Sequence, residues 1–194
     1  SKSCSRTCIF ETKFFDDFHC QFKYLRSCKS HAVNVSLDIQ MTNISQLFSS
    51  TVELQEFNTK NINHIPSFGS IIYTVFLDRS EYIYVGIGGL SGKSVQDRNP
   101  RSRIIQHAQG RRSGDQFCIY IQDFYVIPEL IGSKYTPKKG YLDLLTKQFI
   151  ESRLTYRYLV VQSEDSDQVV RQLERELQRD QYGYGVPLLN GTRK

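Results

Sequence analysis

Residues 70–110 read SIIYTVFLDRSEYIYVGIGGLSGKSVQDRNPRSRIIQHAQG, and this stretch decides the predicted fold. It begins with two runs of β-branched and aromatic residues, 71–77 and 82–87, whose composition is typical of β-strands. The polar residues 78–81 between these runs indicate a tight turn, so we predict an antiparallel hairpin.

A helix is expected after the hairpin. Arg103 and His107 stand four residues apart beside apolar Ile104, and in a helix this spacing places two side chains one above the other. Strand alternation would put Tyr82 and Tyr84 on one face of the hairpin. We therefore expect phenols, a guanidinium and an imidazole to converge on one surface.

The glycine-rich loop at residues 86–94 has the sequence GIGGLSGKS. Its Gly-Lys-Ser end fits a nucleotide phosphate loop, but Ile87 stands where that motif needs its first glycine, and the residues that follow look like loop rather than helix. We favour a nucleic-acid site instead, in which Gly86 and Gly88 let a backbone approach closely because they carry no side chains.

Arginines surround His107. Arginine side chains commonly contact phosphate groups, although a charged segment can also be a solvated helix face, and this alternative stays open. Besides Gly86 and Gly88, the candidate substrate-binding residues are Lys93, Arg98, Arg101, Arg111 and Arg112.

The second half of the chain alternates between strand and helix patterns. Residues 116–126 alternate as a strand that would pair with the hairpin. Residues 141–154 have helical apolar spacing, and residues 155–162 are again strand-like. A last amphipathic helix is expected over residues 167–179.

Short motifs in order along the chain resemble those of the GIY-YIG nuclease superfamily. They are Ile71-Ile72-Tyr73, Tyr84-Val85-Gly86, Arg103 with His107, Glu174 within LEREL, and Pro187 with Asn190. The first motif has Ile71 where the family has glycine, and the interval from His107 to Glu174 is longer than in minimal members. The resemblance does not extend to residues 1–66.

The resemblance implies an α+β fold with a small, mostly antiparallel, three-stranded central sheet flanked by helices. An N-terminal appendage would occupy residues 1–66 and bind DNA or zinc, and the nuclease-like domain would occupy residues 67–194. We place the boundary there because residues 56–66 are polar and end in proline.

The resemblance also implies a metal-dependent DNA endonuclease that leaves 5′-phosphate and 3′-hydroxyl ends by a one-metal mechanism. Glu174 would hold Mg²⁺ or Mn²⁺, Tyr73 would be the general base, and Tyr84 would hydrogen-bond the phosphate or the water. Arg103 would stabilise the developing negative charge, and His107 would orient Tyr73 or relay its proton.

An unperturbed phenol has a pKa of about 10, so Tyr73 would need cationic neighbours to lower its pKa if it is to act as a base near neutral pH. Lys93 is a candidate for the lysine that some restriction enzymes of the superfamily place near this tyrosine. Asn190 is expected to hold backbone rather than to react.

Other carboxylates compete for the metal role. Periodicity alone places Glu174 and Glu176 equally beside the apolar stripe of the last helix, and only the family pattern prefers Glu174. Glu151 lies in a similar helical pattern and is the reserve candidate, and Glu129 is a further rival.

A function from another class is a non-catalytic nucleic-acid-binding module that keeps the fold without turnover. The presence of every polar position of the nuclease pattern disfavours this alternative. A protein that only binds nucleic acid needs no carboxylate beside arginines that bind phosphate.

The chain has 194 residues and a formal net charge of +5, which suits a polyanionic partner such as duplex DNA. No apolar run approaches the roughly 18 residues that span a bilayer, and no secretory signal pattern is seen. We therefore expect an intracellular protein without a membrane partner, and a homodimer if the chain is a restriction-type enzyme.

The sequence has 5 cysteines, most of them near the N-terminus, and this odd number favours reduced thiols over a disulfide scaffold. Two spacings fit paired zinc ligands, Cys4 with Cys8 and Cys28 with His31. The alternative is that these cysteines are small side chains of a hydrophobic core.

Overall fold

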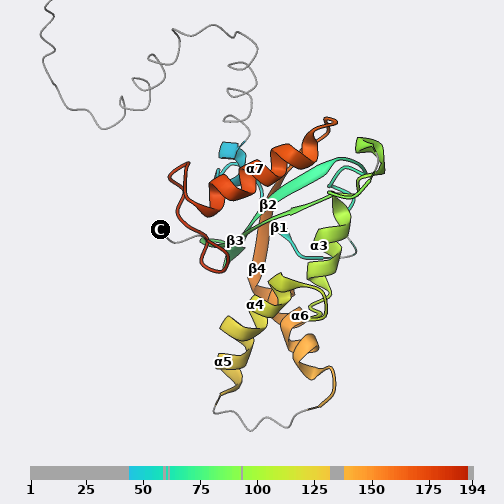
Figure 1. Ribbon diagram of the computed structural model, residues 1–194. Helices are drawn as coiled ribbons and strands as arrows, with labels where there is room; N and C mark the ends of the chain where they lie inside the picture. The colour runs from blue at the N-terminus through green and yellow to red at the C-terminus, as the bar shows by residue number, and fades with distance from the viewer. Residues whose placement is uncertain (1–43, 59, 61, 93, 132–137, 192–194) are drawn as a thin grey trace, which may run out of the picture. The chain divides into compact units, whose positions relative to one another are not determined.

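The computed structural model describes residues 44–58, 60, 62–92, 94–131 and 138–191 (Figure 1). The chain divides into the units Ser1–Gln40 and Met41–Lys194, and all described residues belong to the second unit. The predicted zinc ligands Cys4, Cys8, Cys28 and His31 and the predicted phosphate contact Lys93 lie outside the described residues.

The described residues form an α+β fold around an antiparallel sheet, as predicted for the fold class. The strands are β1 (Gln55–Glu56), β2 (Ser70–Leu77), β3 (Glu81–Gly88) and β4 (Leu154–Val161). Their order is β1-β4-β2-β3, so the sheet has 4 strands rather than the three predicted. The additional strand β1 has 2 residues, which is too short to give an alternating sequence pattern.

The predicted hairpin is formed by β2 and β3, which pair in antiparallel register. Its turn contains Asp78 and Arg79 at φ values of 47° and 65°, a left-handed conformation that suits the twist of a hairpin. The register shifts near the turn, because Val75 pairs with Tyr84 whereas Phe76 pairs with Tyr82. This irregularity interrupts the alternation of side chains along β3.

The shift separates the two β3 tyrosines. Tyr84 belongs to the hydrophobic cluster that includes Ile104, whereas Tyr82 packs against the cluster that includes Val170. The expectation that Tyr82 and Tyr84 share one face is therefore wrong, because a strand with an extra residue does not keep its period of two.

Helices cover both faces of the sheet. The 3₁₀ and π segments are η2 (Ser45–Leu47), η3 (Val95–Asp97) and η4 (Gln122–Val126). The α-helices are α3 (Arg101–Ala108), α4 (Gln116–Ile121), α5 (Ile127–Leu130), α6 (Tyr141–Arg153) and α7 (Ser166–Gln178). Among these segments, no helix is long and apolar enough to cross a membrane.

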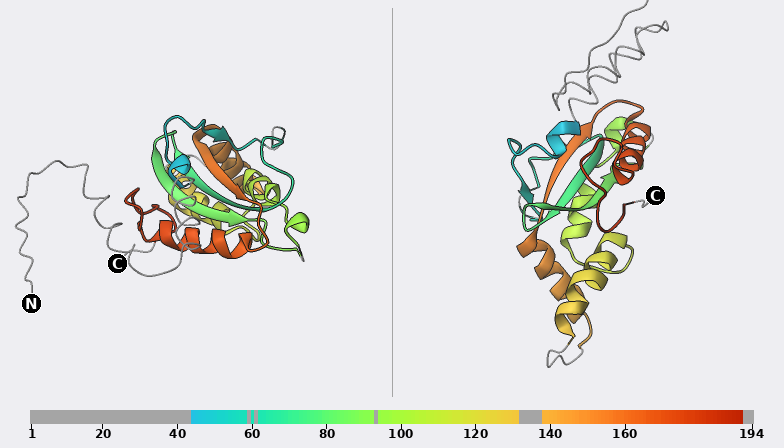
Figure 2. Two further views of the ribbon diagram at one scale, coloured as in Figure 1. Left: turned by 90° about the horizontal axis from the view of Figure 1, so that it is seen from above. Right: turned by 90° about the vertical axis from the view of Figure 1, so that its left-hand side faces the viewer.

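The predicted last helix is α7, and its apolar stripe packs against the side of the sheet that carries Ile72 and Val85 (Figure 2). Helix α3 packs against the opposite side, because Ile104 joins Ile71 and Tyr73 in the other cluster. Strand β2 is therefore buried along its whole length, which explains its continuous apolar sequence.

The strand predicted at residues 116–126 is wrong, because this segment is helical in α4 and η4. Asp115 caps α4 by accepting a hydrogen bond from the backbone N–H of Phe117 at 3.1 Å. Helices α4, α5 and α6 lie together beyond the N-terminal end of β4 (Figure 1). The helix predicted over residues 141–154 and the strand over residues 155–162 are confirmed as α6 and β4.

The compact unit also includes described residues that precede the predicted boundary at residue 66. Ile44 and Leu47 are buried on the α7 side of the sheet, and Phe57 and Ile65 are buried on the α3 side. The hydrophobic core around the sheet therefore includes residues before residue 66. Within the polar segment 56–66, the isolated apolar side chains of Phe57 and Ile65 are buried in that core.

Candidate functional site

A pocket of about 620 Å³ opens beside the edge strand β3, between α3 and α7. Tyr84 and Gly88 of β3, Arg103 of α3, and Arg171 and Glu174 of α7 line it. Three of the predicted catalytic residues therefore line the same pocket although they lie far apart in the sequence: Tyr84, Arg103 and Glu174.

The Glu174 carboxyl group is half-buried at this pocket. Burial raises its pKa from the ordinary 4.5 to about 7, although the charges of Arg171, Arg103 and Arg175 oppose this rise. No described residue forms a hydrogen bond or salt bridge with this carboxyl group. Glu174 therefore offers oxygen ligands of the kind that Mg²⁺ prefers.

Tyr73 lies behind the pocket and is fully buried. Its hydroxyl is 2.5 Å from Nε2 of His107. Burial raises the pKa of Tyr73 well above its ordinary value, Tyr84 raises it further, and Arg103 lowers it. A general base at this position would need cations to lower this pKa, and that requirement is not met because desolvation outweighs the charge of Arg103.

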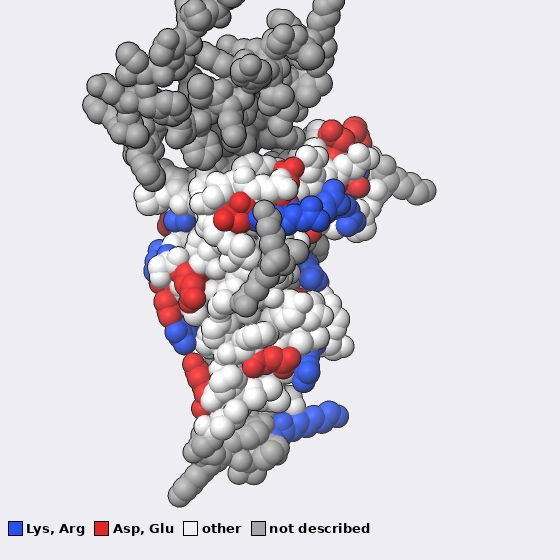
Figure 3. Space-filling view, turned by 60° about the vertical axis from the view of Figure 1, so that its left-hand side comes forward, with Lys and Arg blue, Asp and Glu red and all other residues white. Residues whose placement is uncertain are grey.

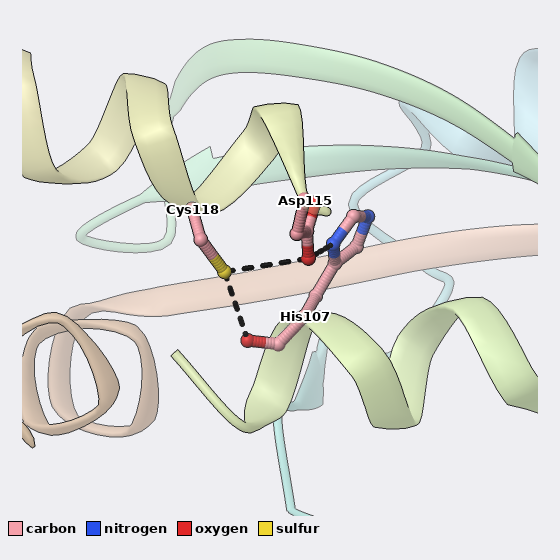
Figure 4. Close-up of side chains that lie close together, drawn as sticks. All are labelled: His107, Asp115 and Cys118. Carbon is pink, nitrogen blue, oxygen red and sulfur yellow. Dashed lines mark hydrogen bonds and ion pairs between the residues drawn. The ribbon is translucent and has the colours of Figure 1, made fainter. Parts of the chain in front are cut away.

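The other ring nitrogen of His107 is hydrogen-bonded to Asp115 (Figure 4). Nδ1 of His107 is 2.6 Å from Oδ2 of Asp115, and both side chains are buried. Burial lowers the pKa of His107, the hydrogen bond that Nδ1 donates to Asp115 and the charge of that carboxylate oppose this shift, and the charge of Arg103 adds to it. His107 is therefore a neutral imidazole near neutral pH.

Asp115 is a site residue that the sequence prediction missed. Burial raises its pKa, but the hydrogen bond that His107 donates to it and the charge of Arg103 together outweigh burial, so the pKa lies below its ordinary value and the carboxylate stays ionised. The available signal was an aspartate at a helix N-cap position, and the strand predicted over residues 116–126 concealed it.

His107, Asp115 and Cys118 are the described residues whose ligand atoms gather closely enough to suggest a metal, within 4.8 Å of one another. The Cys118 thiol donates to Oδ2 of Asp115 at 3.3 Å, and burial raises its pKa. Ligands about 2.1 Å from one tetrahedral ion lie roughly 3.4 Å apart, which is longer than the His107–Asp115 separation. These side chains therefore form a hydrogen-bonded cluster.

Arg103 connects this buried cluster to the pocket. Its guanidinium donates to Oε1 of Gln106 at 2.8 Å and lies 3.6 Å from Oδ1 of Asp115. Burial raises the pKa of Tyr84, as it does for Tyr73, and Arg103 opposes both shifts. Arg103 is the cation shared by the two phenols.

Gly86 and Gly88 have packing roles. A Cβ atom on Gly86 would lie 2.3 Å from the Tyr73 hydroxyl oxygen, and one on Gly88 would lie 2.7 Å from Cβ of Arg103. Gly88 also lines the pocket, whereas Gly86 is not among its lining residues. Gly86 therefore provides space for Tyr73 rather than a surface for substrate.

The predicted phosphate-binding arginines lie in different environments. Arg98 is buried and donates to Oγ of Ser166 at 2.5 Å, and Arg101 donates to the backbone oxygen of Ile65 at 2.7 Å. Both guanidinium groups thus hold parts of the fold together. Arg111 and Arg112 are exposed to solvent, and Arg112 lies 4.0 Å from the carboxylate of Asp123 in a surface ion pair.

Leu189 and Asn190, which follow α7, hydrogen-bond the backbone of β3, the strand that carries Tyr84. Asn190 accepts from the backbone N–H of Val85 at 3.2 Å and donates to its oxygen at 2.6 Å. The backbone of Leu189 also donates to Ile83 at 2.8 Å. Asn190 therefore holds the β3 backbone beside Tyr84, which is the kind of role expected for it.

The rival carboxylates lie elsewhere. Glu151 pairs with Lys147 at 3.6 Å, and Glu129 pairs with Arg153 at 3.3 Å. Glu176 hydrogen-bonds Tyr182 and Gln172. None of these glutamates lines the pocket that contains Glu174.

Comparisons of the chain with family models, with curated proteins and with solved structures found no match. The interpretation of the pocket therefore depends on its own residues. A half-buried carboxyl, a shared arginine and a phenol face one cavity, with a hydrogen-bonded tyrosine and histidine behind them.

Proposed function

We propose that this chain is a metal-dependent DNA endonuclease of the GIY-YIG type, cutting phosphodiester bonds to leave 5′-phosphate and 3′-hydroxyl ends. The observation that carries the proposal is the convergence of Tyr84, Arg103 and Glu174 on one pocket. Tyr73 and His107, the other two residues of the predicted set, are hydrogen-bonded to each other.

Glu174 is the residue that would hold a divalent cation. Its carboxyl faces an open cavity and has no competing hydrogen bond among the described residues, which fits a hard cation that keeps most of its waters. A bound Mg²⁺ or Mn²⁺ would supply Lewis-acid stabilisation of negative charge on the phosphate.

Arg103 and Tyr84 would act on the phosphate itself. The Arg103 guanidinium is partly exposed to the pocket and is placed to neutralise charge as it develops in the transition state. Because Tyr84 lines the pocket and Tyr73 is fully buried, we assign contact with the water or phosphate to Tyr84. Tyr73 would transfer a proton to His107.

DNA is the proposed substrate because exposed Arg111 and Arg112 follow the α3 helix that carries Arg103. The surface in Figure 3 carries acidic as well as basic side chains, without a continuous field of one sign. Phosphate binding is therefore attributed to these particular arginines rather than to the net charge.

The alternative is a non-catalytic nucleic-acid-binding module of the same fold. The burial of Tyr73 and its raised pKa favour this alternative, because a general base must exchange protons with the substrate water. Turnover therefore separates the two functions.

The test is conversion of supercoiled plasmid to nicked or linear DNA by the full chain, with Mg²⁺ or with EDTA. Cutting should require Mg²⁺ and should be lost in Glu174→Gln and Tyr73→Phe, while Glu151→Gln serves as the matched control. Absence of cutting by the wild type, together with salt-sensitive DNA binding, would support the binding module.

A further inference from the structure

Asp115, His107 and Tyr73 form a continuous hydrogen-bonded chain inside the protein. The Tyr73 hydroxyl is 2.5 Å from Nε2 of His107, and Nδ1 of His107 is 2.6 Å from Oδ2 of Asp115. The exposed fraction is 1% for Asp115 and 0% for His107 and Tyr73, so solvent does not compete for these bonds.

The partners of Asp115 define the tautomer of His107. An ionised carboxylate can only accept, and Asp115 also receives the Phe117 N–H, the Cys118 thiol and the charge of Arg103. Nδ1 of His107 must therefore carry the proton that it shares with Asp115. Nε2 of the neutral ring then has a lone pair directed at the Tyr73 hydroxyl.

We infer that Asp115 is a positioning residue of the proposed nuclease site, which holds His107 in the Nδ1–H form so that Nε2 receives the proton of Tyr73. The catalytic part of this inference rests on the proposed function, whereas the tautomer does not. The arrangement follows the general rule that a base is oriented by a third group.

The proton transfers balance. The oxygen of an attacking water bonds to phosphorus, and the bond from phosphorus to the 3′ oxygen breaks. Tyr84 in the pocket accepts one proton from that water, and Tyr73 passes one proton to Nε2 of His107. The transfer between the two phenols, whose ring centroids lie 6.4 Å apart, is part of the proposal, and both phenols end neutral. The leaving 3′ oxygen takes a proton from solvent, and His107 later releases its proton to solvent.

Ionised Asp115 has a second effect in this step. His107 becomes an imidazolium in a buried place, where an isolated charge is costly. The adjacent carboxylate offsets that cost, and it does so only at the moment when His107 is charged. Removing the negative charge should therefore slow proton transfer more than it weakens substrate binding.

Asp115 also caps α4, so a useful substitution must remove the carboxylate charge beside His107 and keep the capping hydrogen bond. Asparagine caps helices about as well as aspartate, and Asp115→Asn therefore retains the hydrogen bond to Phe117. The asparagine amide can donate to Nδ1, which favours the Nε2–H form of His107. Glu164→Gln, at an exposed acidic position outside the pocket, is the control for lost charge.

The first measurement is the ¹⁵N and imidazole proton spectrum of the full wild-type chain without metal. The chain has 4 histidines, and the His107→Gln spectrum identifies the signals of His107. A protonated Nδ1 with a downfield-shifted proton is expected, and Asp115→Asn should move the proton to Nε2. Protonation of Nε2 in the wild type would overturn the inference. If His107→Gln does not fold, backbone-linked resonance assignment of the wild type identifies the His107 signals instead.

The second measurement is DNA cleavage by variants whose thermal melting shows a folded chain. Asp115→Asn should lower kcat by about 100-fold or more and leave KM nearly unchanged, since general acid–base groups contribute this much. A folded Asp115→Asn protein with the kcat of Glu164→Gln would overturn the positioning role. If the wild type cuts no DNA, the proposed function fails, and the spectrum alone still decides the tautomer.

Discussion

Tyr73 and His107 are separated by 34 positions in the sequence, yet the Tyr73 hydroxyl lies 2.5 Å from Nε2 of His107 inside the core. This contact joins β2 to α3 across the edge strand β3, which carries Tyr84. Changes that move β3 relative to β2 should therefore alter the buried hydrogen-bonded chain as well as the pocket.

Gly86→Ala tests this dependence. A Cβ atom at Gly86 would lie 2.3 Å from the Tyr73 hydroxyl oxygen, so the tyrosine or the strand must shift. We expect the variant to lose about 1–3 kcal/mol of unfolding free energy, as overpacked cores do, and most of its cleavage activity. Denaturant unfolding and the plasmid assay measure these changes.

A double variant provides the control for Gly86→Ala. Tyr73→Phe removes the oxygen atom nearest to the added methyl group, so part of the stability loss should be recovered in the combined variant. If the two losses instead add within about 0.5 kcal/mol, the clash does not involve the Tyr73 hydroxyl.

Glu174 should make the stability of the metal-free protein depend on pH. Its pKa rises from 4.5 in the unfolded chain to about 7 in the folded chain, chiefly through burial. The folded state therefore binds this proton more tightly, and the stabilisation is present below pH 4.5 and is lost as the pH rises through 7. Thermal melting in EDTA at several pH values measures the loss.

Glu174→Gln should remove this dependence between pH 5 and pH 8, because glutamine does not titrate, whereas exposed Glu151→Gln should keep it. Addition of Mg²⁺ or Mn²⁺ at about pH 8 should stabilise the wild type and Glu151→Gln but not Glu174→Gln. Equal stabilisation of all three proteins by the metal would contradict the assignment of Glu174.

Much of the fold could be predicted because its local patterns agree with its tertiary structure. The runs 71–77 and 82–87 gave the hairpin, and the apolar stripe of residues 167–179 gave α7. The strand prediction for residues 116–126 is wrong. Aromatic and β-branched residues alternate there as in a strand, but the N-cap at Asp115 directs the chain into a helix. Sequence pattern alone did not weigh this local hydrogen bond.

The candidate site was predictable only in part. The resemblance supplied Tyr84, Arg103 and Glu174, which the structure brings to one pocket. It supplied neither Asp115 nor the burial of Tyr73, because both depend on how α3 and α4 pack against the sheet. The raised pKa of Tyr73 could not be predicted for the same reason, since desolvation is a property of the folded core.

Arg98 should matter for stability rather than for DNA contact. Its guanidinium lies 3.3 Å from Asp167 and donates to Ser166, at the start of the helix that carries Glu174. Arg98→Ala leaves these groups without their buried partner, and we expect a loss of about 1–3 kcal/mol in unfolding free energy. Chemical denaturation measures it. Arg111→Ala, at an exposed position, should stay within about 0.5 kcal/mol of the wild type.

Arg111 and Arg112 should instead contribute to DNA binding through phosphate charge. Each substitution to glutamine should weaken binding to all sequences alike and should reduce the slope of log affinity against log salt by about 1. Arg79→Gln is the control, because Arg79 lies in the hairpin turn, at the opposite end of β3 from Gly88. Fluorescence anisotropy of a labelled duplex at several salt concentrations measures the slopes. If Arg79→Gln lowers the slope as much as Arg111→Gln does, binding follows the net charge of the protein, and the surface beside α3 is not the DNA contact.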